Sequence, residues 1–123
     1  MNDLSPPHDV DAEAGTLGGM LISREVISDV LEILELADFY RPVNATIFDA
    51  ISALFSKGEP ADPITVARYL DDHGDLQRVG GIPYLHTLTE FVPTAANATY
   101  YARIVSDRAA LRRLQELGRC SPS

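Results

Sequence analysis

The side chains that could bind a metal ion or transfer a proton are few in this sequence and lie far apart. The three histidines are His8, His73 and His86, and none is followed by another histidine or a cysteine three or four residues later. Zinc sites draw on closely spaced nitrogen and sulfur ligands of this kind. The single cysteine, Cys120, can neither complete a metal cluster nor form an internal disulfide. We therefore predict no metal site.

Two glycine pairs raise the question of a phosphate-binding loop. Neither Gly18-Gly19 nor Gly80-Gly81 is followed by the Lys-Ser or Lys-Thr of a P-loop, and neither follows a predicted strand. Close helix packing accounts for the first pair, and a turn accounts for the second. We expect no cofactor-binding residues in this chain.

Paired carboxylates, which could serve as general acid and base, occur at Asp9 and Asp11 and at Asp71 and Asp72. Both pairs fall at predicted helix ends, where capping and the helix dipole account for acidic side chains. No nucleophile is recognisable beside a base and an oxyanion hole. We expect no catalytic residues, so the chain by itself is predicted not to be an enzyme.

The formal net charge of −8 is unevenly distributed along the chain. Residues 1–40 hold nine acidic side chains and one basic one, and residues 41–100 hold seven acidic and four basic ones. Residues 101–123 hold two acidic side chains and five arginines. An acidic body repels a phosphate backbone, so weak or no direct DNA binding is expected. Arginines near the end of a helix are explained most simply by its dipole, although they could also meet a phosphate or an acidic protein surface.

Length and composition indicate one globular domain. The chain has 123 residues, 46% of them hydrophobic, which suffices for a single core. Its apolar runs are too short to cross a bilayer, and its start lacks the basic and apolar regions of a signal peptide. Together with the single cysteine, these features predict a cytoplasmic protein without a membrane partner.

Helical patterns with clear start and stop signals fill the sequence, and no segment alternates with the period of two that a strand requires. The fold class is therefore all-α, a compact orthogonal bundle of about five short helices plus a long C-terminal helix. The expected helices start at the following capping residues and prolines: Asp9, Ser23, Pro42, Asp62-Pro63, Pro83 and Thr94. The expected units are a flexible arm 1–8, a helical head 9–93, the long helix 94–117 and a disordered tail 118–123.

Three glycines interrupt the first predicted helix. Gly15, Gly18 and Gly19 each lower helix propensity by about 1 kcal/mol relative to alanine. Small residues at these positions are best explained by another helix that crosses closely. The sequence therefore predicts a tight helix crossing here.

The last predicted helix, 94–117, is the most informative segment, because a helix of this length extends ~35 Å and outruns a small head. Its apolar face must then be covered by further chain or by another copy. Core packing alone and an intermolecular or hairpin contact remain open for Tyr100 and Tyr101, one of which can face the head and the other away. The residues predicted to form an oligomer or hairpin interface are Tyr101, Ile104, Val105, Arg108, Leu111 and Leu114.

An ordered series of short motifs covers nearly all of residues 6–114. The motifs are Pro6-Pro7-His8, Ala12-Glu13, Leu17-Gly18-Gly19, Asp38-Phe39-Tyr40, Arg41-Pro42, Ile47-Phe48, Ala50-Ile51, Gly58-Glu59-Pro60-Ala61-Asp62, Val79-Gly80-Gly81, Tyr84-Leu85, Val92-Pro93-Thr94-Ala95-Ala96-Asn97, Tyr101, Ile104-Val105, Arg108 and Leu111-Arg112. Each motif alone is weakly specific, but their order and spacing are strongly so. In this series the chain resembles the N-terminal domain of DnaB-type replicative DNA helicases.

The resemblance implies an all-helical head followed by a long helical hairpin. In that family, pairs of hairpins dimerise, three dimers form a collar on the hexamer, and the collar recruits primase through the helical C-terminal domain of primase. ATP hydrolysis with Mg²⁺ and DNA translocation belong to a RecA-like domain with Walker motifs, which these 123 residues do not include. The resemblance therefore implies ring assembly and primase recruitment in DNA replication, without catalysis in this fragment.

Two features depart from the family pattern. Asn44 stands where relatives often have histidine, so any role of that histidine is in doubt. By this resemblance we expect residues 117–123 to end the chain before the second helix of the hairpin, which would leave the first helix with an uncovered apolar face. We expect self-association or fraying of that helix.

Two other functions remain as alternatives. A truncated remnant would either do nothing or occupy a collar position in full-length rings as a dominant-negative fragment. A small helix-turn-helix regulator would need basic and amide side chains near the start of its recognition helix. The best placed helix, 63–72, offers only Arg68.

Overall fold

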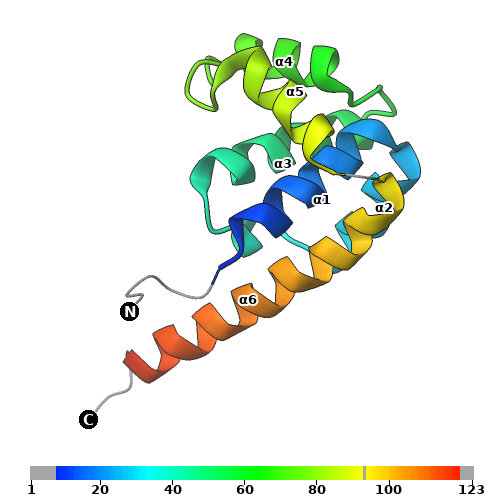
Figure 1. Ribbon diagram of the computed structural model, residues 1–123. Helices are drawn as coiled ribbons and strands as arrows, with labels where there is room; N and C mark the ends of the chain where they lie inside the picture. Colours follow the sequence, from blue (N-terminus) through cyan, green and yellow to red (C-terminus); the bar gives the residue numbers. More distant parts are fainter. Residues whose placement is uncertain (1–7, 93, 120–123) are drawn as a thin grey trace.

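The computed structural model of the chain is all-helical, as predicted. It describes residues 8–92 and 94–119, and no strand occurs among them. In Figure 1 the long last helix runs beneath the shorter helices and continues toward the C-terminal end. The helices are α1 (Val10–Ile22), α2 (Arg24–Ile33), α3 (Pro42–Ser56), α4 (Pro63–Asp72), α5 (Gly81–Phe91) and α6 (Ala98–Arg119), with short 3₁₀ turns η1 (Leu36–Asp38) and η2 (Ala95–Asn97).

Local capping signals fix several helix starts. The Asp9 carboxylate accepts a hydrogen bond from the Ala12 backbone N–H at 3.0 Å and caps α1. At α4, Asp62 accepts from the Thr65 N–H at 2.8 Å, and the Thr65 hydroxyl accepts from the Asp62 N–H at 2.9 Å. These reciprocal bonds satisfy two backbone donors that a helix start leaves free. Pro42 occupies the first turn of α3, as predicted.

Two helix starts differ from the prediction. α5 begins at Gly81 rather than Pro83, because proline is accepted in the first turn, where its missing N–H has no helical partner. Gly80 and Gly81 form the turn with positive φ angles of 109° and 73°. Thr94 caps the 3₁₀ turn η2, its hydroxyl accepting from the Ala96 N–H at 3.4 Å, and α6 begins only after that turn.

Helix α1 is the centre of the head. It packs against α2, α3, α5 and α6, and its residues 12–21 are all buried. The three glycines of α1 face its neighbours: a Cβ on Gly15 would collide with the ring of Tyr101, one on Gly18 with the Leu88 carbonyl, and one on Gly19 with the Ala98 Cβ. The predicted close helix crossing is confirmed.

The core is continuous from α1 through all the other helices. Its largest fully buried apolar side chains are Leu17, Met20, Ile27, Val30, Ile47, Ile51, Val66, Leu70, Leu85, Leu88 and Val105. Because Val105 belongs to α6, the first half of the long helix is part of the same core. The predicted arm 1–8 and tail 118–123 lie outside the described residues, apart from His8 and the backbone of 118–119.

Candidate functional site

Helix α6 has two apolar faces with different surroundings. Its inner face consists of Ala98, Ala102, Val105 and Ala109, which recur every three or four residues and are at most 2% exposed. This spacing keeps them on one side of a helix. They lie against α1 and α2, so the small side chains allow α6 to approach the glycines of α1 closely.

The outer face of α6 starts from Tyr100, two residues along from Ala98 and therefore on roughly the opposite side of the helix. Ile104, Leu111 and Leu114 follow at the spacings of a coiled-coil seam. Tyr100 is 67% exposed, Leu111 43% and Leu114 64%, while Ile104 is half-buried at the border with α1. Leu117, one turn further, is 70% exposed. We call Tyr100, Ile104, Leu111, Leu114 and Leu117 the outer face.

The six residues predicted as an interface are divided between these faces. Val105 lies in the core of its own head, and Tyr101 is half-buried with its ring over Gly15. Arg108, Leu111 and Leu114 are exposed, so only part of the predicted set is open to a partner. Leu117 was not included in the predicted interface, and Tyr100 was left open together with Tyr101; the structure places the Tyr101 ring over Gly15 and leaves Tyr100 67% exposed.

Two arginines tie α6 to the 3₁₀ turn η1. Arg112 donates from Nη2 to the Asp38 backbone carbonyl at 2.7 Å, and Arg113 donates from Nη1 to Asp38 Oδ1 at 3.0 Å. The other carboxylate oxygen of Asp38 accepts from the Glu35 N–H at 2.8 Å. Asp38 thus accepts hydrogen bonds both from its own 3₁₀ turn and from α6. The helix dipole alone is therefore an incomplete account of these arginines.

An aromatic stack lies beside this contact. The His8 ring is stacked on the Tyr40 ring, with centroids 4.0 Å apart, and the Arg112 guanidinium lies 5.4 Å from the centroid of the Tyr40 ring. Contacts of a guanidinium with an aromatic face add modest attraction and limit the rotamers of the arginine. Tyr40 is therefore held between the start of α1 and the far half of α6.

Glu13 is a buried acid that sequence reasoning did not single out. Its side chain is 1% exposed and accepts from the Tyr40 N–H at 2.6 Å, the Arg41 N–H at 3.4 Å and Asn44 Nδ2 at 2.9 Å. These donors surround the start of α3, where Arg41 provides no side-chain cap. A carboxylate from α1 therefore caps α3.

Asn44 extends this cluster to α5. Its Oδ1 accepts from the Tyr84 hydroxyl at 2.7 Å while its Nδ2 donates to Glu13. Burial raises the pKa of Tyr84, Glu13 raises it further, and Arg41 acts in the opposite direction. The residue that departs from the family pattern thus joins three helices through hydrogen bonds.

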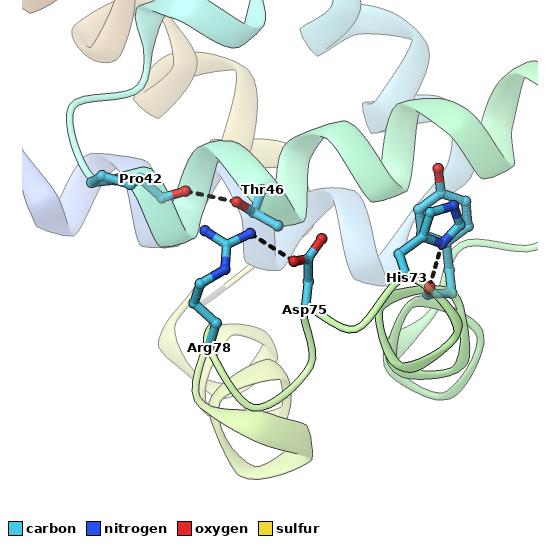
Figure 2. A network of polar contacts seen from close by, with 6 residues as sticks. Pro42, Thr46, His73, Asp75 and Arg78 are labelled. Carbon is cyan, nitrogen blue, oxygen red and sulfur yellow. Dashed lines mark hydrogen bonds and ion pairs between the residues drawn. The ribbon is translucent and has the colours of Figure 1, made fainter.

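A further group of polar contacts lies at the end of α4 and in the loop after it. His73 lies against Tyr69 at the end of α4, with its Nδ1 2.8 Å from the Tyr69 carbonyl, and a cavity of about 300 Å³ lies beside them. Figure 2 shows His73 together with Asp75 and Arg78, which form an ion pair. In the part of the chain that the structure describes, no three His, Cys, Asp or Glu side chains are arranged to hold a metal ion. None of the helices within 8–92 and 94–119 has the length and apolar character of a membrane span.

A helical head and a long helix whose outer face is apolar and exposed define an all-α domain. The chain belongs to the DnaB-like helicase N terminal domain family, whose model matches residues 5–107. The family resemblance noted in the sequence is confirmed.

Relatives of known name agree with this assignment. The chain is 58% identical over 113 residues to the replicative DNA helicase DnaB of Mycobacterium leprae, covering 92% of this chain and 19% of that protein. It is 54% identical over 114 residues to DnaB of Leifsonia xyli, covering 93% of this chain and 25% of that protein. The chain thus spans about a fifth to a quarter of the length of these relatives.

Solved structures show the same fold. The N-terminal domain of DnaB helicase from Mycobacterium tuberculosis superposes with a TM-score of 0.92 at 57% identity, covering 94% of this chain and 83% of that one. The N-terminal domain of DnaB helicase from Helicobacter pylori, described with its interactions with primase, superposes with a TM-score of 0.72 at 22% identity and covers 89% and 85% of the two chains. The second likeness concerns the fold alone.

Proposed function

We propose that this chain is the collar domain of a replicative DNA helicase, which assembles with other copies through the outer face of α6 and recruits primase during DNA replication. The observation that carries the proposal is the exposure of Leu111, Leu114 and Leu117 on the second half of α6. Large apolar side chains gathered on one surface are typical of a binding site.

The spacing of the outer face supports a helical partner. Ile104 and Leu111 are seven residues apart and Leu114 follows three residues later, which are spacings found along the seam where two helices interlock side chains. A second helix laid along α6, from another copy or from a following segment of a longer chain, would cover these residues. Membership of the DnaB family favours that arrangement over a globular ligand.

Primase recruitment is the second part of the proposal. The Helicobacter pylori relative is named for its interactions with primase, and its fold is shared. We assign to this chain a docking role toward the C-terminal domain of primase, and no contact with DNA. ATP, Mg²⁺ and strand separation are assigned to the part of the longer relatives that this chain does not span.

Sedimentation velocity tests both parts. The chain is expected to self-associate alone and to form a heavier complex with the C-terminal domain of primase. Replacing Leu111 and Leu114 by serine should leave a folded monomer, because both side chains are exposed in the single chain.

Ile64→Ser is the matched control. Ile64 is 69% exposed on α4, so its replacement removes similar apolar surface away from α6. A chain that remains monomeric at all concentrations and does not bind the C-terminal domain of primase would contradict the proposal. Equal loss of association in the control would show that apolar exposure in general, and not the outer face, causes the association.

A further inference from the structure

We infer that Asp38, Arg112 and Arg113 form a clamp that sets the direction in which the exposed end of α6 leaves the head, and so positions the outer face for assembly. The residues come from η1 and from α6, which are 74 and 75 positions apart in the chain. The inference rests on the proposed function, because the direction of α6 matters to assembly only when its outer face binds a partner. We call these three residues the α6 clamp.

The clamp lies where α6 leaves the head. Ala109 is buried at 1% exposure, and Arg112 is half-buried over η1. Every residue from 113 to 117 is exposed. Leu114 and Leu117 therefore lie on the exposed segment that follows Arg112 and Arg113, the two residues bonded to Asp38.

The η1 side of the clamp is firmly held. The Asp38 side chain is 7% exposed, and its second oxygen caps η1 through the Glu35 N–H. The next residue, Phe39, packs on Phe48 in the core, with ring centroids 4.8 Å apart. Tyr40 then donates its N–H to the buried Glu13 at 2.6 Å. Asp38 is thus held in a fixed position relative to α1 and α3, and a side chain bonded to Asp38 is held with it.

The two arginines approach Asp38 from successive positions on α6. Arg112 binds the backbone carbonyl and Arg113 binds the carboxylate, so rotation of α6 about its own axis would break at least one bond. The planar guanidinium suits such directed hydrogen bonding better than an ammonium group. Two bonds to one fixed residue therefore restrict both the rotation and the tilt of the helix.

The ion pair of Arg113 and Asp38 is expected to position α6 more than it stabilises the fold. The Arg113 side chain is 58% exposed, and ion pairs open to solvent contribute little to folding. The buried face from Ala98 to Ala109 already fixes the first half of α6. Removal of the clamp should therefore allow the exposed end of α6 to change its orientation while the head stays folded.

The test measures a distance within one molecule. Spin labels are placed at Gln115→Cys on α6 and at Asp71→Cys on α4, in a Cys120→Ser background, and labelled chain is diluted into unlabelled chain. Both positions are exposed. The intact clamp predicts one narrow distance distribution. Asp38→Asn, which keeps an oxygen for the Glu35 N–H but loses the ion pair, should broaden and shift it.

Further variants separate charge from geometry. Arg113→Met should broaden the distribution as Asp38→Asn does, and Arg113→Lys should restore it in part because the charge remains. The matched control is Arg78→Met, which removes an ion pair of 2.8 Å with Asp75 that lies between α4 and α5 and includes no residue of α6 (Figure 2). This control should leave the distance unchanged.

Sedimentation of the same variants, without labels, separates the two proposals. Asp38→Asn and Arg113→Met should weaken self-association by about two- to fivefold, the effect expected of one partly exposed ion pair. An unchanged distance distribution in both variants would overturn the clamp while leaving the collar proposal intact. A wild-type chain that stays monomeric but shows the clamp-dependent distance would overturn the collar proposal instead.

Discussion

The apolar side chains of the two halves of α6 have different surroundings. The first half presents alanine and valine to α1, and the contact of Gly19 with Ala98 leaves no room for another carbon. The second half presents leucines that are exposed by 43–70% and contact little of their own head. Alanine and glycine are found where α1 and α6 approach most closely at Gly19 and Ala98, and the leucines of the second half are exposed. The same helix is therefore a core element in its first half and, under the proposed function, a binding surface in its second half.

The η1 contact marks the boundary between these halves. Arg112 and Arg113 lie three and four positions after Ala109 and bind Asp38, which in turn is linked through Tyr40 to Glu13. Polar bonds take the place of apolar packing at this point. The junction is thus the region where direction can change without loss of the core.

Gly19→Val should produce the largest effect, because it enlarges the contact of α1 with the first half of α6. The added carbons collide with Ala98, and we expect a loss of about 3 kcal/mol in the free energy of unfolding. Urea denaturation followed by far-UV circular dichroism measures it. Ala110→Val, on the exposed side of α6, introduces the same branched residue and should cost only a few tenths of that amount. Equal losses of unfolding free energy in the two variants would mean that the helix propensity of valine, and not the collision at the helix crossing, causes the destabilisation.

Glu13→Gln tests the buried cap on which the junction rests. Hydrogen bonds to a charged acceptor are the stronger ones, so the free energy of unfolding should fall by about 2 kcal/mol. Hydrogen exchange should become faster at the amides of Tyr40 and Arg41. Glu90→Gln, an exposed change on α5, is the control. Unaltered exchange at both amides would contradict the capping role of Glu13.

Tyr84→Phe tests the same cluster through pH. Burial raises the pKa of Tyr84 above its ordinary value of 10.0, so the folded protein retains this proton more strongly than the unfolded chain. The resulting stability is complete below pH 10 and is lost as pH rises through the folded pKa. Wild type should therefore lose more stability than Tyr84→Phe between pH 9 and pH 11, as denaturant titrations at each pH would show. Parallel pH profiles would contradict this linkage.

The variant should also be less stable than wild type at neutral pH. The lost bond from the Tyr84 hydroxyl to Asn44 is expected to cost about 1 kcal/mol. Tyr100→Phe is the control, because that side chain is 67% exposed.

Leu114→Ser should have the smallest effect on folding. Its side chain is 64% exposed, so the free energy of unfolding should change by less than about 0.5 kcal/mol while self-association weakens. Denaturation and sedimentation on the same sample give both quantities. A large loss of stability would show that the second half of α6 packs on its own head, and the comparison of the two halves would fail.

The parts of the fold that depend on neighbours in sequence were predictable. Asp9, Pro42 and the Asp62-Pro63 step start helices because their caps and dihedral angles act over three or four residues. The glycines of α1 indicated a close crossing, because they would otherwise only weaken the helix. The identity of the crossing helices needed the structure, since Gly15 and Gly19 meet α6 some eighty residues later.

The polar clusters were not predictable either, because the residues that form them are far apart in the sequence. Nothing near Glu13 distinguishes it from the other acids of a helix start, because its partners follow 27 to 31 residues later. Val105 was grouped with the outer leucines since both faces of α6 are apolar, and apolar character alone does not tell which face meets the head. The Arg113 contact with Asp38 spans 75 residues and has no local signal.

Distances between copies of the chain test the central claim most directly. A single spin label at Gln115→Cys, beside the outer face of α6, is compared with one at Asp71→Cys on α4, each in a Cys120→Ser background. The account predicts a short, well-defined distance between copies for the Gln115 label and a longer or undefined one for the Asp71 label. A short distance at Asp71, or no coupling between copies at Gln115 under conditions where the chain associates, would contradict assembly through the outer face.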